Sequence, residues 1–250
     1  MILLTFNIIS SKSDFVKNHR IEDQEIIKIT EQNTSAILRI LESQNILVTF
    51  FVEISMVSKL TTLIKKISRS GHEVSFYNDS STLAEIETAK KTTEEYLGKI
   101  IRGIRQKDVF HSVAELKNLE FNYISNIENA QILFPFQRLK RSTEISQMNG
   151  LSIIPESISP YSQIPYNDFV FQMLPSALYK NMVTETMRND DFVLIYLDSR
   201  QFTDFDRFKF KIPFYRKYNS GKEMEDKLED FLRWINDHEN ATSRVKDFVF

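Results

Sequence analysis

The segment from residue 48 to residue 76 limits the fold more than any other part of this 250-residue chain. Residues 48–52 are apolar, β-branched or aromatic, with the length and composition of a buried strand. Apolar residues then recur at helical spacing, and a glycine follows where a helix would stop: Val57, Leu60, Ile64, Ile67 and Gly71. Residues 73–76 begin a second strand. A strand, a helix and a strand in succession form one turn of an α/β fold, in which the two strands lie parallel.

The rest of the chain repeats this alternation, which predicts a mainly parallel sheet, open or closed into a barrel. Strands are expected at residues 3–6, 46–52, 73–76, 100–104, 121–125, 131–134, 151–154 and 192–197. Helices are expected at residues 31–43, 57–70, 82–97 (with Ser80 or Ser81 as N-cap and Gly98 as stop), 110–119, 176–188 and 222–235. Residues 10–25 and the proline-containing segment 155–175 are expected to be irregular, and residues 245–250 to add an edge strand. No repeat or linker interrupts the pattern, so we expect a single domain over residues 1–250.

Composition excludes several classes of function. The net charge of -2 gives no electrostatic reason to expect a nucleic acid or an anionic membrane surface as partner. No apolar run reaches the roughly 18 residues that a membrane span needs, so membrane insertion is not expected. The five glycines cannot build a glycine-rich phosphate loop. The first residues read as a strand and not as a signal peptide, and cysteine is absent, so we expect a cytoplasmic protein.

The run "VTFFV" followed by "LIKKISRSGHEVSFYNDSS" resembles the polysaccharide deacetylases, the NodB-homology domain of carbohydrate esterase family 4. In that family an "ATFFV" strand and a helix lead into "GHEIGxHxxxH", whose two later histidines bind a divalent metal such as zinc. The corresponding residues here are Tyr77 and Ser81, while His72 matches the first histidine, which is not a ligand. The resemblance implies a distorted (β/α) barrel of the polysaccharide deacetylase type.

Further motifs of this family occur in the same order along nearly the whole chain. "LTFN" resembles the first motif, TFDD or TFDxE, with Asn7 where the family has its general base and isoleucines where the next acidic ligand stands. "GIRQ" resembles GFRxP, with Arg105 retained and Lys107 in place of proline. "LIYLDS" resembles LYLHPWE, with Asp198 where the family has its acid histidine. The stretches "FNYISNI", "IPES" and "MLP" resemble the subgroup tied to exopolysaccharide synthesis.

The replaced residues argue against the family's reaction. Metal-assisted deacetylation needs an ion, a base and an acid. Hydroxyl groups are poor substitutes for imidazole ligands, and an amide does not take up a proton near neutral pH. The sequence therefore predicts a pseudoenzyme without a cofactor or metal, retained as a saccharide-binding or protein-binding module of cell-surface or exopolysaccharide metabolism. We expect its pocket to be formed by six residues: Asn7, Tyr77, Asp79, Ser81, Arg105 and Asp198.

Two alternatives stay open at this stage. Asp79, Asp108 and Asp198 follow expected strands, where sites of such folds collect, and could rebuild a metal or base site. The chain would then be a metal-dependent hydrolase of C–N (amide) bonds that deacetylates N-acetylated sugars. Alternatively, Asp79 only caps or turns its loop and the other two aspartates are solvated. A third role is that of an inactive subunit that pairs with an active homologue.

Other candidate binding residues have two interpretations each. Arg105 either binds a ligand through paired hydrogen bonds or forms an ion pair with Asp198. The cluster Arg138, Lys140 and Arg141 is more consistent with a solvated loop than with a glycan or nucleic-acid surface, because the rest of the chain is not basic. A few of the 20 phenylalanines are candidates to line the 155–175 segment and to offer a surface on which a sugar stacks.

Overall fold

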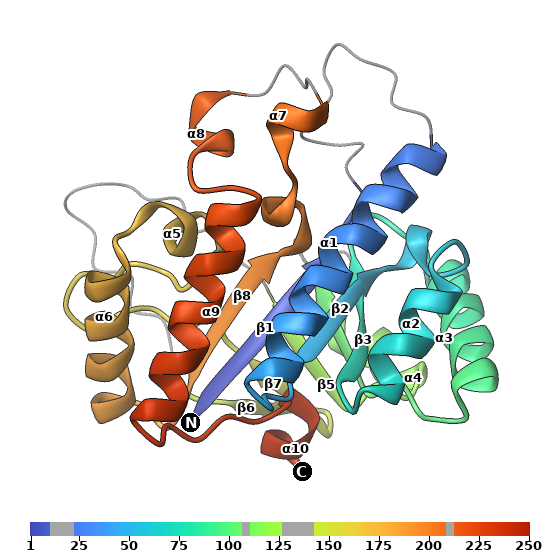
Figure 1. Cartoon of the computed structure of the whole chain (residues 1–250). Coiled ribbons are helices and arrows are strands. Elements are labelled where there is room, and N and C mark those ends of the chain that lie inside the picture. Colours follow the sequence, from blue (N-terminus) through green and yellow to red (C-terminus); the bar gives the residue numbers. More distant parts are fainter. Residues whose placement is uncertain (11–22, 107–110, 127–142, 209–212) are drawn as a thin grey trace.

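A curled sheet of eight strands forms the centre of the molecule in the computed structural model, which describes residues 1–10, 23–106, 111–126, 143–208 and 213–250 (Figure 1). The strand order is β6-β7-β5-β4-β3-β2-β1-β8, and every neighbouring pair is parallel except β6 with β7. The strands are β1 Ile2–Ile8, β2 Thr49–Glu53, β3 Glu73–Asn78, β4 Gly103–Gln106, β5 Tyr123–Asn126, β6 Ser146–Met148, β7 Leu151–Ile154 and β8 Val193–Asp198. The expected α/β class and distorted barrel are confirmed.

Helices cover the outer face of the sheet (Figure 1). In chain order, the helices that precede β8 are α1 Asp23–Ser43, η1 Ile54–Met56, α2 Thr61–Arg69, α3 Leu83–Leu97, α4 Val113–Asn118, α5 Asp168–Met173 and α6 Ser176–Asn189. Those after it are η2 Ser199–Phe202, α7 Phe205–Phe208, α8 Phe214–Lys217, α9 Lys222–Asp237 and α10 Val245–Val249. Alternation along β1 explains the layering: Leu4, Phe6 and Ile8 pack in the large core under the helices, whereas Leu3 belongs to the smaller inner core.

The segment after β7 covers the free edge of β8. The backbone N–H of Leu194 donates to the Ser157 hydroxyl at 2.8 Å, and that of Tyr196 donates to the Tyr166 carbonyl at 3.1 Å. These bonds satisfy edge donors of the strand, as a neighbouring strand would. Within the described residues the barrel is therefore completed on this side by a loop and not by a ladder.

The inner face of the sheet is polar at the amino ends of the strands. The Glu73 carboxylate accepts from the Thr49 hydroxyl at 2.7 Å and from the Tyr123 hydroxyl at 3.0 Å. Burial raises the pKa of Glu73, and these hydrogen bonds oppose that rise. The Tyr123 ring passes directly over Gly103, where an added Cβ would lie 1.9 Å from Cζ. A glycine is required at this position because the ring leaves no room for a side chain.

The C-terminal segment closes the same end of the barrel, so the expected edge strand at residues 245–250 is wrong. The segment forms the short helix α10, which lies beside the N-terminus in Figure 1. The backbone N–H of Val245 donates to the Thr49 hydroxyl at 2.9 Å, and that of Lys246 donates to Glu73 at 3.0 Å. Its Val and Phe residues suggested a strand, but partners inside the barrel favour the helix.

Several element boundaries also differ from expectation. The N-cap of α3 is Thr82 and neither Ser80 nor Ser81, because Thr82 forms a capping box with Glu85; Gly98 ends that helix in the left-handed conformation, as expected. The 155–175 segment contains α5, and β6 was not expected. Helix α1 begins at Asp23, within the span expected to be irregular. The strand expected at residues 131–134 lies outside the described residues.

Candidate functional site

Four of the six expected pocket residues lie in one layer at the carboxyl ends of the strands. Asn7, Tyr77 and Arg105 are each the penultimate residue of their strand, and Asp198 is the last residue of β8. Asn7 pairs in register with Asp198, and Arg105 pairs with Tyr77 on one side and Ser125 on the other. Because side chains alternate between the faces of a strand, all five point to the inside of the curled sheet. This is the last inward-facing layer before the strands end.

Arg105 occupies the middle of this layer and is fully buried. Its Nη1 donates to Asn7 Oδ1 at 2.7 Å, while Nε and Nη2 donate to Ser125 Oγ at 3.1 and 3.0 Å. The guanidinium carbon lies 3.9 Å from the centre of the Phe51 ring. Burial lowers the pKa of Arg105 to about 10, so the group remains charged at neutral pH.

Asp198 is tied to a different arginine. Its carboxylate oxygens accept from Arg200 Nε at 3.0 and 2.9 Å, and the backbone N–H of Arg200 donates to Oδ1 at 2.8 Å. Asp198 is 4% exposed and caps the short helix η2. The ion pair between Arg105 and Asp198 is therefore not formed, and the interpretation of Asp198 as solvated is wrong. Asp108, Lys107, Arg138, Lys140 and Arg141 lie outside the described residues.

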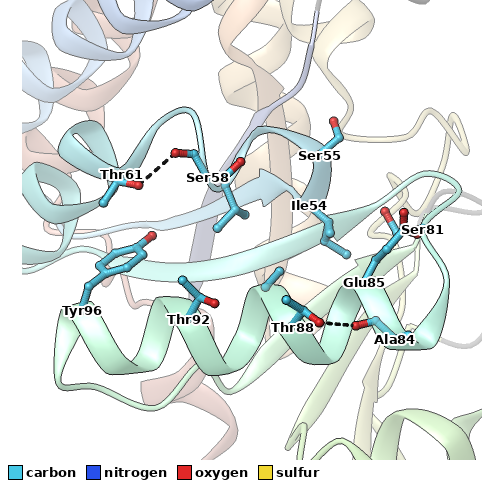
Figure 2. A pocket seen from close by; sticks show the side chains of 12 residues that line it. Ile54, Ser55, Ser58, Thr61, Ser81, Ala84, Glu85, Thr88, Thr92 and Tyr96 are labelled. Atoms are coloured by element: carbon cyan, nitrogen blue, oxygen red, sulfur yellow. Dashed lines mark hydrogen bonds between the residues drawn. The ribbon is translucent and has the colours of Figure 1, made fainter.

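Ser81 leaves this layer, whereas Asp79 lies near enough to Tyr77 for its charge to act on that hydroxyl. The backbone N–H of Ser81 donates to Asn78 Oδ1 at 2.9 Å, so Asn78 and not Asp79 stabilises the turn after β3. The Ser81 carbonyl lies 2.8 Å from His111 Nε2. Ser81 also lines a groove of about 640 Å³ on the outer side of the barrel, which Figure 2 shows between residues 54–61 and α3. Other residues of that groove are Ile54, Ser55, Val57, Ser58, Thr61, Ala84, Glu85, Thr88, Ala89, Thr92 and Tyr96.

Tyr77 is a hydrogen-bond donor at neutral pH. Burial raises its pKa above the ordinary value, and the charges of Asp79 and Asp198 raise it further. Its hydroxyl and the Asn7 amide nitrogen have no hydrogen-bond partner among the residues that the structure describes. The layer therefore offers two neutral donors beside a buried cation.

The donor set does not fit a divalent metal. Within the described residues there is no group of three or more histidine, aspartate or glutamate side chains that could hold one. Asp198 already uses its oxygens for Arg200.

Sequence reasoning missed three residues of the site. The Tyr196 hydroxyl donates to Glu156 Oε1 at 2.5 Å, and the ring lies 5.4 Å from the Arg105 guanidinium carbon. Alternation along β8 would have placed Tyr196 on the same face as Asp198. Burial, with a further contribution from Asp198, raises the pKa of Asp168 to about 6, and Arg200 opposes this shift. Nothing in the irregular 155–175 segment distinguished Glu156 or Asp168.

Comparisons with known proteins connect this arrangement to a fold family. No family model and no curated protein matches the sequence. Solved structures do match, among them a putative polysaccharide deacetylase from Mycobacterium smegmatis, with a TM-score of 0.62 and 14% identity over 99% of this chain and 88% of that one. A probable polysaccharide deacetylase from Pseudomonas aeruginosa PAO1 has a TM-score of 0.60 and 12% identity over 99% of this chain and 89% of that one.

A third similar structure is a CE4 family pseudoenzyme from Bacillus anthracis, with a TM-score of 0.54 and 10% identity. The whole of this chain aligns with 65% of the pseudoenzyme, so it spans about two thirds of that protein. At sequence identities this low, the structural similarity establishes the fold and nothing more. In the described residues, no helix is long and apolar enough to cross a membrane. The chain has the fold of the polysaccharide deacetylases of carbohydrate esterase family 4, as its sequence motifs implied.

Proposed function

We propose that this chain is a catalytically inactive protein with the deacetylase fold, and that it binds a saccharide at the carboxyl end of the barrel. The observation that carries the proposal is the 2.7 Å hydrogen bond from Arg105 to Asn7. It places a neutral amide beside the retained arginine, at the position where the family's first motif has its carboxylate base.

Three features of the layer support inactivity. The Asn7 amide cannot take a proton from water, the hydroxyl of Tyr77 stays protonated, and both oxygens of Asp198 accept hydrogen bonds from Arg200. Metal-assisted hydrolysis depends on a cation that polarises the carbonyl and activates water. Within the described residues, no group of three histidine, aspartate or glutamate side chains is present to hold such a cation. The existence of a CE4 family pseudoenzyme with this fold supports the idea that the scaffold persists without the activity.

Exposed aromatic side chains near the carboxyl end of the barrel support the proposal that a saccharide binds there. Phe169 on α5 is 46% exposed and Phe214 on α8 is 82% exposed. Tyr215 joins them, because its ring centre lies 6.4 Å from that of Phe169 and 6.0 Å from that of Phe214. Figure 1 shows α8 at the end toward which the arrowheads of β1 and β8 point. Aromatic faces present a rigid apolar surface on which the C–H face of a sugar ring can lie.

The test combines metal analysis, an activity assay and a binding assay. Protein purified after growth with added zinc or cobalt is expected to contain far less than one equivalent of metal. It is also expected to release no acetate from N-acetylated oligosaccharides, whereas an active deacetylase of the same fold does so in parallel. A panel of oligosaccharides is expected to contain at least one that raises the melting temperature. A stoichiometric metal together with acetate release would refute the proposal that the protein is catalytically inactive. A panel in which no oligosaccharide binds would refute the proposal that it binds a saccharide.

One observation favours the alternative of a hydrolase with a rearranged site. Asp168 has a pKa of about 6 and lies close enough to Asp198 for their charges to interact, and a carboxyl group of this pKa can serve as a base near neutral pH. This alternative predicts a bound metal that is lost in Asp198→Ala. A protein partner and a cytoplasmic location remain predictions, for which co-purification and cell fractionation are the tests.

A further inference from the structure

The outer groove between residues 54–61 and α3 takes no part in the proposed function. Its volume of about 640 Å³ lies within the roughly 300–1,000 Å³ that small-molecule sites occupy. The wall formed by α3 runs from Ala84 to Tyr96, a rise of about 18 Å along the helix. Figure 2 shows Ser55, Ser58 and Thr61 on the opposite side of the groove from α3. A groove of this size suits a small molecule better than a protein partner.

The lining of the groove carries almost no charge. Among the described residues that line it, Glu85 is the charged one, and its Oε2 accepts from the Thr82 backbone N–H at 2.8 Å and from the Thr82 hydroxyl at 2.9 Å. Burial raises the pKa of Tyr96, so its hydroxyl is neutral at pH 7. Lys65 lies over the Tyr96 ring, 5.3 Å from its centre, and does not line the groove. A charged ligand would lose hydration here without gaining an ionic partner, so an uncharged ligand is favoured.

Hydroxyl side chains supply the polar contacts. Three of the six serine and threonine hydroxyls of the groove donate to acceptors within the chain. The other three, those of Ser58, Ser81 and Thr92, form no hydrogen bond with any residue that the structure describes. Each hydroxyl can both donate and accept a hydrogen bond. These groups therefore match a ligand that itself carries several hydroxyls.

Apolar side chains lie deeper in the groove than these hydroxyls. Ile54 is 7% exposed and Val57 is 3% exposed, whereas Ser58 and Thr92 are exposed. Ala89 adds an apolar contact from α3. An apolar floor with hydroxyls at the rim suits a ring that has a C–H face and hydroxyl groups around its edge.

We propose that this outer groove binds an uncharged sugar, at a site separate from the carboxyl end of the barrel. The C–H face of a sugar ring lies over Ile54 and Val57, and its hydroxyls bond to Ser58, Ser81 and Thr92. The inference goes beyond the proposed function, because it uses none of the residues on which that function depends.

The test measures binding at pH 7 by saturation-transfer NMR, with cellotriose as an uncharged trisaccharide and sorbitol as an uncharged open-chain polyol. Cellotriose is expected to bind saturably. Sorbitol is expected to bind at least tenfold more weakly, because an open chain lacks the flat C–H face of a ring. Equal affinities for the two compounds, or no saturable binding of cellotriose, would overturn the proposal.

Substitutions on the two walls locate the binding. Thr92→Lys places a long side chain at the rim, and lysine favours a helix more than threonine does, so we expect an unchanged melting temperature and a dissociation constant for cellotriose raised at least tenfold. Thr62→Lys is the matched control, because Thr62 is exposed on α2 and does not line the groove. Thr92→Val removes the hydroxyl and keeps the shape, so it should weaken binding by about two- to tenfold. Wild-type affinity in Thr92→Lys would overturn the proposal.

Phe214→Ala separates this site from the one at the carboxyl end. It removes an exposed aromatic side chain of α8 and leaves the groove unchanged. Binding of cellotriose that is lost in Thr92→Lys and kept in Phe214→Ala would assign it to the groove. The reverse result would overturn this inference and support the proposed function. A stoichiometric metal with acetate release would reject the proposed function and leave the result for the groove in place.

Discussion

Replacement of Gly103 by alanine tests the packing that holds the inner layers together. The added Cβ would lie 1.9 Å from Tyr123 Cζ and 2.2 Å from its hydroxyl oxygen. Both distances are far below contact, so the Tyr123 ring has to move. Its hydroxyl donates to Glu73 at 3.0 Å and lies 2.8 Å from the Ser75 hydroxyl. Movement of the ring therefore breaks bonds to a buried carboxylate.

The expected loss of stability follows from these two effects. Overpacking of a buried site costs about 1–3 kcal/mol. Loss of a hydrogen bond to a buried charged group adds about 1.5–3 kcal/mol. We therefore expect Gly103→Ala to lower the free energy of unfolding by about 2.5–6 kcal/mol. For a chain of this size, that corresponds to a fall in melting temperature of roughly 5–24 °C.

Chemical denaturation of both proteins measures this difference, and Gly98 offers a matched control. Gly98→Ala makes the same chemical change where no atom lies within 4 Å of the new Cβ, although its φ of 62° disfavours a side chain. That control is expected to cost only about 1–2 kcal/mol. A double-mutant cycle with Tyr123→Ala is expected to show that removal of the ring relieves most of the clash. The reasoning fails if Gly103→Ala costs no more than Gly98→Ala, or if the cycle shows no coupling.

Three further predictions concern charge and the C-terminus. Asn7→Asp is expected to stabilise the protein by about 1–2 kcal/mol at pH 7, because the attraction to Arg105 exceeds the cost of desolvating the new carboxylate. This stabilisation should be lost as the pH falls through the depressed pKa of the introduced carboxyl group. A loss of stability at pH 7 would contradict the prediction. Burial, with a smaller effect of Arg244, lowers the pKa of His72 to about 4, so the His72 imidazole binds a proton more readily in the unfolded chain than in the folded protein. The free energy of unfolding should therefore decrease as the pH falls from roughly 6.5 to 4, with a slope approaching 1.4 kcal/mol per pH unit. Denaturation at several pH values should show that His72→Asn lacks this pH-dependent component. Removal of residues 244–250 is expected to cost at least about 2 kcal/mol because Val245 is fully buried, whereas removal of Phe250 alone, which is 66% exposed, should have little effect in the same unfolding assay.

The convergence of Asn7, Tyr77 and Arg105 could be predicted from the sequence because each stands near the carboxyl end of an expected parallel strand. Parallel strands bring these ends to one edge, and alternation sends all three side chains to the same face. The prediction failed for Ser81, which does not join these three side chains. Ser81 lies beyond β3, where the turn stabilised by Asn78 directs it to the outer groove. Register inside strands was predictable, but the direction of a loop was not.

Partners that come from irregular segments could not be predicted. The bond between Glu156 and Tyr196 joins a loop to β8. The pairing of Asp198 with Arg200 is local, but an aspartate at the end of a strand gave no sign that it would be 4% exposed. The capping box of Thr82 and Glu85 was visible as a threonine three residues before a glutamate, and it should have been preferred over Ser81.

Each of the two polar layers inside the barrel holds a buried charge through neutral partners. At the amino ends of the strands, Glu73 accepts hydrogen bonds from Thr49, Tyr123 and the backbone of Lys246. At the carboxyl ends, Arg105 donates to Asn7 and Ser125, and the charge of Glu156 also acts on it. Hydrogen bonds within the chain therefore stabilise both charges, and the loss of either set is expected to leave a costly buried ion.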